Sequence, residues 1–225
     1  MKKYLGAMVM VLSLMGALTV TMAVGAEKEK ASAPEGWVLV EESVVMDLSE
    51  AALEHFQAAR ELYLKGDLKG SAAQIKDASA LLKLEANRAQ GDLKKQMMEH
   101  ARNLDMMAGQ VAAGAVKSVE QLDRDFVYAQ VLLAHHHLMK ASEFLSVQKI
   151  PEAGKDLGRS GAYLETGLTW AGKKMDQTYH EAITEAKDLS KKIQNGEKVS
   201  AEQLKATIDK LKNKIEEYDK IITPK

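Results

Sequence analysis

The feature that most constrains the fold of this chain is an internal similarity. The sequence matches itself without a gap when it is displaced so that residue 118 aligns with residue 200. We call this 82-residue displacement the repeat shift. It aligns residues 118–122 (Ser-Val-Glu-Gln-Leu) with residues 200–204 (Ser-Ala-Glu-Gln-Leu), and Gly114 with Gly196. Apolar positions at helical spacing align as well, namely Leu104, Met107, Val111, Phe126 and Leu133 with Ala186, Leu189, Ile193, Ile208 and Ile215. Such a match indicates an internal duplication of one helical unit.

Composition favours helix over most of the chain. From Asp47 on, Ala, Leu, Met, Glu, Lys and Gln dominate, and proline occurs only at positions 151 and 224. These residues have high helix propensities, whereas proline breaks helices. Start and stop signals divide the region into seven predicted helices. The boundary signals are Asp47, Gly66 with Asp67, Gly91 with Asp92, a Ser118/Gln121 capping box, Pro151, a start near Lys173, Asn195 with Gly196, and a Ser200/Gln203 capping box.

The fourth predicted helix carries two apolar stripes, which predicts burial on two sides. Its stripes are Val119, Leu122, Phe126, Ala129 and Leu133, and Val127, Val131, Ala134, Leu138, Ala141 and Leu145. The last helix has a single stripe and should lie on the outside. We therefore predict an all-α fold of two tandem bundles, residues 47–127 and 128–222, which share this long central helix.

The N-terminus has the pattern of a signal peptide. Lys2 and Lys3 precede an apolar stretch over residues 5–24, and residues 24–26 (Val-Gly-Ala) offer a small-residue cleavage site. We predict a cleaved signal over residues 1–26, with an uncleaved anchor as the alternative, because about 20 apolar residues can span a bilayer. Residues 27–46 should form a polar tail and an extended arm, since residues 37–40 and 43–46 are rich in β-prone side chains.

Cysteine usage and charge exclude several classes of function. The chain has no cysteine, which rules out c-type haem attachment, thiolate metal sites and cysteine nucleophiles. Its formal net charge is −1, or about −3 once Lys2 and Lys3 leave with the signal. A near-neutral chain offers no electrostatic attraction for nucleic acid or anionic lipid. We expect a periplasmic protein with no nucleic-acid partner and no membrane association after cleavage.

Histidine and methionine raise the possibility of a metal site. Three adjacent histidines, residues 135–137, cannot bind one ion from one regular helix because successive side chains point about 100° apart. His137 aligns with His55 under the repeat shift, which favours a histidine hydrogen-bonded at a helix crossing. The alternative is metal or haem-iron binding, because thioether and imidazole groups suit copper. Its candidate ligands are His55, His100, His136, His137, Met98 and Met106.

Aromatic residues gather near the end of the fifth predicted helix. Tyr163 and Trp170, with Tyr179 beyond the turn, stand in a stretch that also contains Gly158, Gly161, Gly167 and Gly172. They are candidates for lining a ligand groove between helices. The competing interpretation is that the small residues let helices approach closely while the aromatic rings fill the core.

No motif indicates catalysis. The chain lacks a nucleophile elbow, a phosphate-binding glycine loop, a zinc-protease motif and the paired Glu-x-x-His motifs of di-iron bundles. Acidic pairs such as Asp123 and Asp125 point in different directions on a helix, so we expect them on a solvated face. The prediction is a non-enzymatic protein without a cofactor.

The first predicted hairpin resembles a known family. Residues 58–68 (Ala-Ala-Arg-Glu-Leu-Tyr-Leu-Lys-Gly-Asp-Leu), followed by residues 78–82 (Ala-Ser-Ala-Leu-Leu), resemble the opening hairpin of the YfdX family of exported bacterial helical proteins. The likeness is confined to this hairpin, and the second copy replaces Gly66 and Asp67 with Gln148 and Lys149. The resemblance implies a periplasmic, non-enzymatic protein with a stress-related or chaperone-like role.

Taken together, these patterns predict an exported binding or stress-response protein that acts through helix faces and an inter-helix groove. Its partner would be a protein, a peptide or a small molecule, and a homo-oligomer is compatible with the sequence. The alternative is a periplasmic protein that binds copper, zinc or haem iron through histidine and methionine side chains.

Overall fold

A computed structural model describes residues 9–12, 37–40, 42–172 and 176–222, with side chains from residue 51 on. In these ranges the chain forms seven helices and two short strands. Residues 1–48 and 49–225 form two separate units, and each is considered by itself. Most of the predicted signal segment and of the polar tail lies outside the described residues, so both stay predictions. No helix within the described ranges combines the length and apolar character that a bilayer crossing requires.

The N-terminal unit contains a two-stranded antiparallel ribbon. Strand β1 (Val9–Leu12) pairs with strand β2 (Trp37–Val40), with Val9 opposite Val40 and Leu12 opposite Trp37. The extended conformation predicted for the arm is thus present at β2. The arm ends earlier than predicted, however, because helix α1 (Glu42–Leu64) begins before Asp47. Adding residues to an existing helix requires no new nucleus, which offsets the modest β preference of Val44 and Val45.

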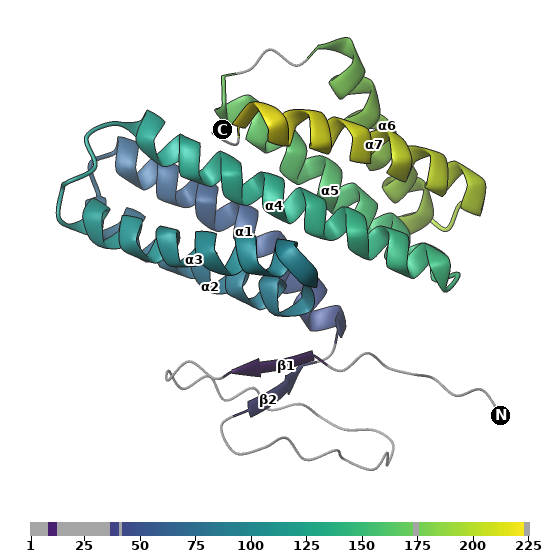
Figure 1. Ribbon diagram of the computed structural model, residues 1–225, viewed down its shortest axis with the longest axis horizontal. Helices are drawn as coiled ribbons and strands as arrows, with labels where there is room; N and C mark the ends of the chain where they lie inside the picture. The colour runs from purple at the N-terminus through teal and green to yellow at the C-terminus, as the bar shows by residue number, and fades with distance from the viewer. Residues whose placement is uncertain (1–8, 13–36, 41, 173–175, 223–225) are drawn as a thin grey trace. The chain divides into compact units, whose positions relative to one another are not determined.

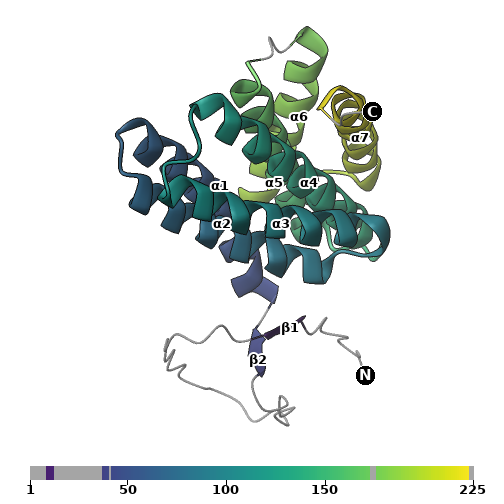
Figure 2. The same ribbon diagram turned by 60° about the vertical axis from the view of Figure 1, so that its left-hand side comes forward.

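The C-terminal unit is built entirely of helices in its described part. After α1, its helices are α2 (Leu68–Arg88), α3 (Gly91–Ala112), α4 (Val119–Ser146), α5 (Ile150–Trp170), α6 (Gln177–Gln194) and α7 (Ala201–Ile222). Figure 1 shows α4 running between α1, α2 and α3 on one side and α5, α6 and α7 on the other, and Figure 2 shows the same order from another direction. Helix α4 contacts α2, α3, α5 and α7.

Side-chain caps are present at the starts of α2, α6 and α7. Asp67 caps α2 by accepting a hydrogen bond from the N–H of Gly70 at 2.9 Å. The predicted capping box before α7 is confirmed, because Ser200 and Gln203 exchange side-chain-to-backbone hydrogen bonds of 3.0 and 3.1 Å. Helix α4 begins after Ser118 as predicted, but the predicted capping box is absent, since the Ser118 side chain caps no backbone N–H.

Helix α6 also starts later than predicted. It begins at Gln177 rather than near Lys173, because Asp176 accepts hydrogen bonds from the backbone N–H groups of Thr178 and Tyr179. An aspartate in this position satisfies N–H groups that have no partner within the helix.

Helix boundaries recur at the interval of the repeat shift. The shift lays α2 on α5, the ends of α1 and α3 on the ends of α4 and α6, and the start of α4 on the start of α7. Gly66 and Gln148, which the shift also matches, both have positive φ angles, 80° and 59°. Gln148 is the single non-glycine residue with positive φ in the described part of the chain.

Both apolar stripes of α4 are buried. Leu122, Phe126 and Leu133 of the first stripe are fully inaccessible, and Val131 and Leu138 of the second stripe are almost so. Phe126 of the first stripe packs against Phe56 of α1, with ring centroids 5.0 Å apart. In the second stripe, the backbone oxygen of Ala134 accepts a hydrogen bond from the Ser160 hydroxyl of α5. A helix that is apolar on two flanks buries both of them.

Glycines allow α5 and α6 to pack closely. A Cβ atom added at Gly158 would overlap the Ser190 side chain, and one added at Gly154 would overlap Ile193. Both glycines lie on the same face of α5, one turn apart. The sequence interpretation in which small residues bring helices together is confirmed at this contact.

The shared turn geometry leads to a stability prediction. A left-handed backbone conformation costs a non-glycine residue roughly 1–2 kcal/mol. Glycine avoids this cost but loses more backbone entropy on folding, so its net advantage at such a position is smaller. We expect Gln148→Gly to raise the free energy of unfolding by up to about 1 kcal/mol, measured by urea denaturation. Gly66→Gln, the reverse change at the matching turn, should lower it. Equal stability of the Gln148→Gly variant and the parent would contradict the argument.

Candidate functional site

The strongest concentration of chemically capable side chains lies in the core around His136 and His137 of α4. Both rings are buried, at 1% and 0% exposure. Adjacent residues on a helix point about 100° apart, so the two histidines face different neighbours. His136 meets α2, and His137 meets α5. We call this set of buried polar residues the polar centre; it comprises Glu85, Arg88, Gln130, His136, His137, Asp156 and Arg159.

On the α2 side, Glu85 is held by two partners. Arg88 Nη1 donates to both carboxylate oxygens of Glu85, at 3.2 and 2.9 Å. His136 Nε2 lies 2.9 Å from Glu85 Oε2. Glu85 is completely buried and Arg88 nearly so. A buried carboxylate is tolerated when a partner of opposite charge accompanies it.

The pKa shifts assign charges to this group. Burial raises the pKa of Glu85, but the contact with His136 and the positive charges nearby outweigh it, so the pKa falls from 4.5 to about 2. Burial lowers the pKa of His136 from its ordinary 6.5, and the contact with Glu85 opposes this effect without overcoming it. His136 is therefore neutral at pH 7, and Arg88 supplies the charge that compensates Glu85.

On the α5 side, His137 is fixed by a carboxylate and an aromatic ring. Its Nδ1 lies 2.8 Å from Asp156 Oδ1, and its ring stacks on Tyr163 with centroids 5.5 Å apart and planes 4° from parallel. Arg159 Nη1 lies 3.7 Å from the same Asp156 oxygen. The arrangement repeats the α2 side in outline, because an acidic residue and an arginine three positions later meet one histidine of α4.

Several buried polar atoms along the contact of α4 with α5 have no hydrogen-bond partner. Both side-chain amide atoms of Gln130 lack one, as do His137 Nε2 and Asp156 Oδ2. Gln130 is completely buried. A buried polar group without a partner costs about 1–3 kcal/mol. This helix contact is consequently less favourable than its close packing suggests.

The remaining metal-ligand candidates lie apart from the polar centre. His55 Nδ1 lies 2.7 Å from Gln74 Oε1, and His100 Nε2 lies 2.8 Å from the backbone oxygen of Asp125. Met98 is half-buried, whereas Met106 is 61% exposed. Within the described residues, no group of three or more histidine or acidic side chains is placed to hold a metal ion. The structure does not bring the six candidates together.

The pairing of His55 with Gln74 matches that of His137 with Asp156. Each histidine is 19 residues before its partner, and the repeat shift lays one pair on the other. A histidine hydrogen-bonded at a helix crossing, as the sequence comparison of these two positions favoured, is present in both halves.

The aromatic candidates for a ligand groove do not share one. Tyr163 is buried against His137, and Trp170 packs on Phe126 with centroids 6.1 Å apart. Tyr179 is buried edge-on against Tyr218, with centroids 6.5 Å apart. The three rings contact three different partners, as expected of side chains that fill a core.

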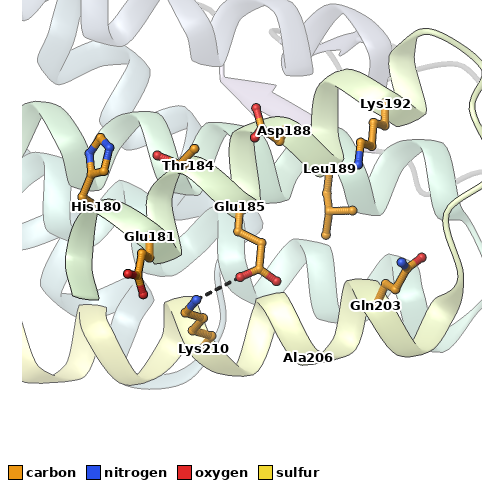
Figure 3. A pocket seen from close by; sticks show the side chains of 10 residues that line it. All are labelled: His180, Glu181, Thr184, Glu185, Asp188, Leu189, Lys192, Gln203, Ala206 and Lys210. Atoms are coloured by element: carbon orange, nitrogen blue, oxygen red, sulfur yellow. Dashed lines mark hydrogen bonds and ion pairs between the residues drawn. The ribbon is translucent and has the colours of Figure 1, made fainter. Parts of the chain in front are cut away.

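An open groove lies instead between α6 and α7 (Figure 3), with a volume of about 650 Å³. Glu185 is held at its edge by Lys210, at 3.0 Å, and by the Thr207 hydroxyl, at 2.7 Å. Leu189 and Ala206 are the apolar part of its wall. The other lining residues are His180, Glu181, Thr184, Asp188, Lys192 and Gln203.

Sequence reasoning missed three of these features. It placed Asp123 on a solvated face, whereas Asp123 is buried and paired with Arg60 of α1 at 2.7 and 3.0 Å. It also overlooked the acid-x-x-Arg pairs of the polar centre, although both lie on an apolar helix face, where charged residues are rarely found unless paired. The groove between α6 and α7 could not be recognised from the sequence, because its residues have the composition of an ordinary solvent-exposed helix face.

In comparisons with known proteins, no family model, no curated protein and no solved structure matches the chain.

Gln130 provides a test of the unpartnered amide. Gln130→Met replaces it with an apolar side chain of similar length, and we expect the free energy of unfolding to rise by about 1 kcal/mol or more, measured by urea denaturation. Ser160→Ala is the control, because the Ser160 hydroxyl donates to the backbone oxygen of Ala134 at 2.7 Å and its loss should destabilise the protein. A destabilised Gln130→Met variant would show that the amide has a partner.

The polar centre also predicts how stability depends on pH. The pKa of His136 is lowered in the folded state, so the unfolded chain binds the extra proton and stability falls as the pH drops below about 6.5. The pKa of Glu85 is also lowered, so a second loss follows as the pH falls from 4.5 towards 2. His100 and His135, whose pKa values burial also lowers, contribute to the first loss.

The His136→Gln variant isolates one contribution. Glutamine keeps an N–H donor near Glu85 but does not titrate, so the loss of stability between pH 7.5 and pH 5.5 should be smaller than in the parent. Urea denaturation at both pH values measures the difference. His180→Gln, at an exposed position, should keep the parental dependence. Identical slopes for His136→Gln and the parent would exclude His136 as a source.

Proposed function

We propose that this chain is an exported, non-enzymatic binding protein of a stress-response, chaperone-like kind, which acts through its helix faces and the groove between α6 and α7. The observation that carries the proposal is the separation of two sets of side chains. The groups best suited to acid–base chemistry lie in the closed polar centre, whereas the open groove is lined by exposed side chains of mixed charge.

The groove has the character of a binding surface. Glu181, Glu185 and Asp188 stand on successive turns of α6, with Lys192 and Lys210 among them and Leu189 with Ala206 between the two helices. Apolar wall and charged rim together suit a polar peptide or a flexible segment of an unfolding protein. The resemblance of residues 58–82 to the YfdX hairpin supports the same class of role.

Export is part of the proposal. The basic start, the apolar stretch over residues 5–24 and the small residues at positions 24–26 support a cleaved signal and a periplasmic location. The absence of cysteine fits a protein whose stability in that compartment comes from packing and paired charges rather than from disulfides.

We also propose that the helical unit is a duplicated one and that α4 is shared between its halves. Three correspondences under the repeat shift support this, namely the helix boundaries, the positive φ angles at positions 66 and 148, and the histidine contacts of His55 and His137. A fourth is an ion pair with its charges exchanged, Lys83 with Asp105 and Glu165 with Lys187.

Helix α7 differs from α4 at the positions that the repeat shift matches to the second apolar stripe of α4. Positions of the second α4 stripe, Val127, Val131, Ala134 and Leu138, are buried, whereas the positions that the repeat shift matches to them are exposed and polar. They are Asp209, Asn213, Glu216 and Lys220. Helix α7 thus has one buried face and closes the array, as capping repeats do.

An aggregation assay tests the proposed function. The purified protein should suppress the light scattering of a thermally unfolding client, and Ala206→Phe, which fills the groove, should reduce this effect by more than half. Ala112→Phe places the same side chain at an exposed position of α3 and should behave as the parent. No suppression by the parent, or equal suppression by both variants, would refute a chaperone-like role for the groove.

A further inference from the structure

One histidine of the triplet differs from its neighbours. His136 and His137 are buried against Glu85 and Asp156, whereas His135 is half-exposed on α4. In the described part of the chain, the His135 ring has no hydrogen-bond or ion-pair partner, unlike the rings of His55 and His100. Its ring nitrogens are therefore available to a ligand from solvent.

A methionine stands one turn further along the same helix. Met139 is four residues after His135, and residues at this spacing are neighbours on one face of a helix. The Met139 side chain is 39% exposed, unusual for a large apolar residue of this chain. His135 and Met139 thus present an imidazole and a thioether side by side at the surface of α4.

The surroundings of His135 favour a cation. Helix α7 packs against α4, and its residues Asp219 and Glu216 stabilise positive charge at His135, while Lys212 opposes them. Lys212 and Glu216 themselves lie 3.8 Å apart as an ion pair. The position thus combines an imidazole ligand with acidic side chains on the facing helix.

We propose that His135 and Met139 form a binding site for Cu(I). Thioether sulfur is a soft ligand that selects Cu(I) over the harder divalent ions, and imidazole coordinates copper in either oxidation state. Cu(I) accepts low coordination numbers, so two side chains on one helix can hold it, with solvent completing the shell. The site uses none of the groove residues and is independent of the proposed binding function.

Anaerobic titration with Cu(I) against the chromophoric chelator bicinchoninate tests the site on the purified protein. The parent should bind one equivalent, and His135→Ala and Met139→Leu should each weaken binding by at least about tenfold, since even outer-shell partners of a metal contribute about 10–100-fold. Thermal denaturation of each variant verifies that it is folded.

Two matched controls separate this pair from any exposed ligand. His180→Ala removes an exposed histidine that has a threonine, Thr184, four residues later. Met106→Leu removes a methionine that is 61% exposed and has no histidine within a turn on either side. Both should bind Cu(I) as the parent does.

X-ray absorption at the copper edge supplies a direct readout. We expect one sulfur and one imidazole nitrogen in the parent complex, and no sulfur in the Met139→Leu variant. Failure of the parent to bind, binding that survives His135→Ala or Met139→Leu, or equal loss in the His180→Ala control would each overturn the proposal.

Discussion

The helices of the C-terminal unit depend on α4, whose apolar side chains are buried on two flanks and whose polar side chains must therefore find partners inside the core. Glu85 with Arg88 and Asp156 with Arg159 meet this demand from the two sides, one pair for each buried histidine. Paired charges of this kind contribute little net stability, but removing one partner leaves an uncompensated charge. The polar centre thus fixes which faces of α2, α4 and α5 meet.

Much of the fold could be predicted because helical sequences carry their own boundaries. The Gly66 and Asp67 turn, the Ser200/Gln203 box and the two stripes of α4 all appear as local patterns, and the structure has them where predicted. The predictions were wrong about where α1 and α6 begin and about the cap at Ser118, all at helix ends, which fray and are less defined than helix interiors. Which side chain satisfies an N–H group depends on geometry that the sequence does not contain.

The candidate sites were harder to predict for a different reason. Pairing across helices joins residues far apart in the chain. The sequence does not show that Arg60 faces Asp123, or that His137 faces Asp156, so neither aspartate can be recognised as a buried, paired residue. The groove of α6 and α7 depends on the relative position of two helices whose exposed faces have an ordinary composition. His135 and Met139 stand four residues apart on one helix, a spacing that the sequence shows, but the lack of a hydrogen-bond partner at His135 among the described residues depends on packing that it does not show.

The polar outer face of α7 has a consequence for assembly. In a duplicated array, an apolar strip at positions 209, 213, 216 and 220 would give the next unit the same packing surface that α4 gives to α5. Copies of the chain could then add head to tail without closing, which is how fibres grow. Aspartate, asparagine, glutamate and lysine occupy these exposed positions instead, so α7 presents no such apolar strip.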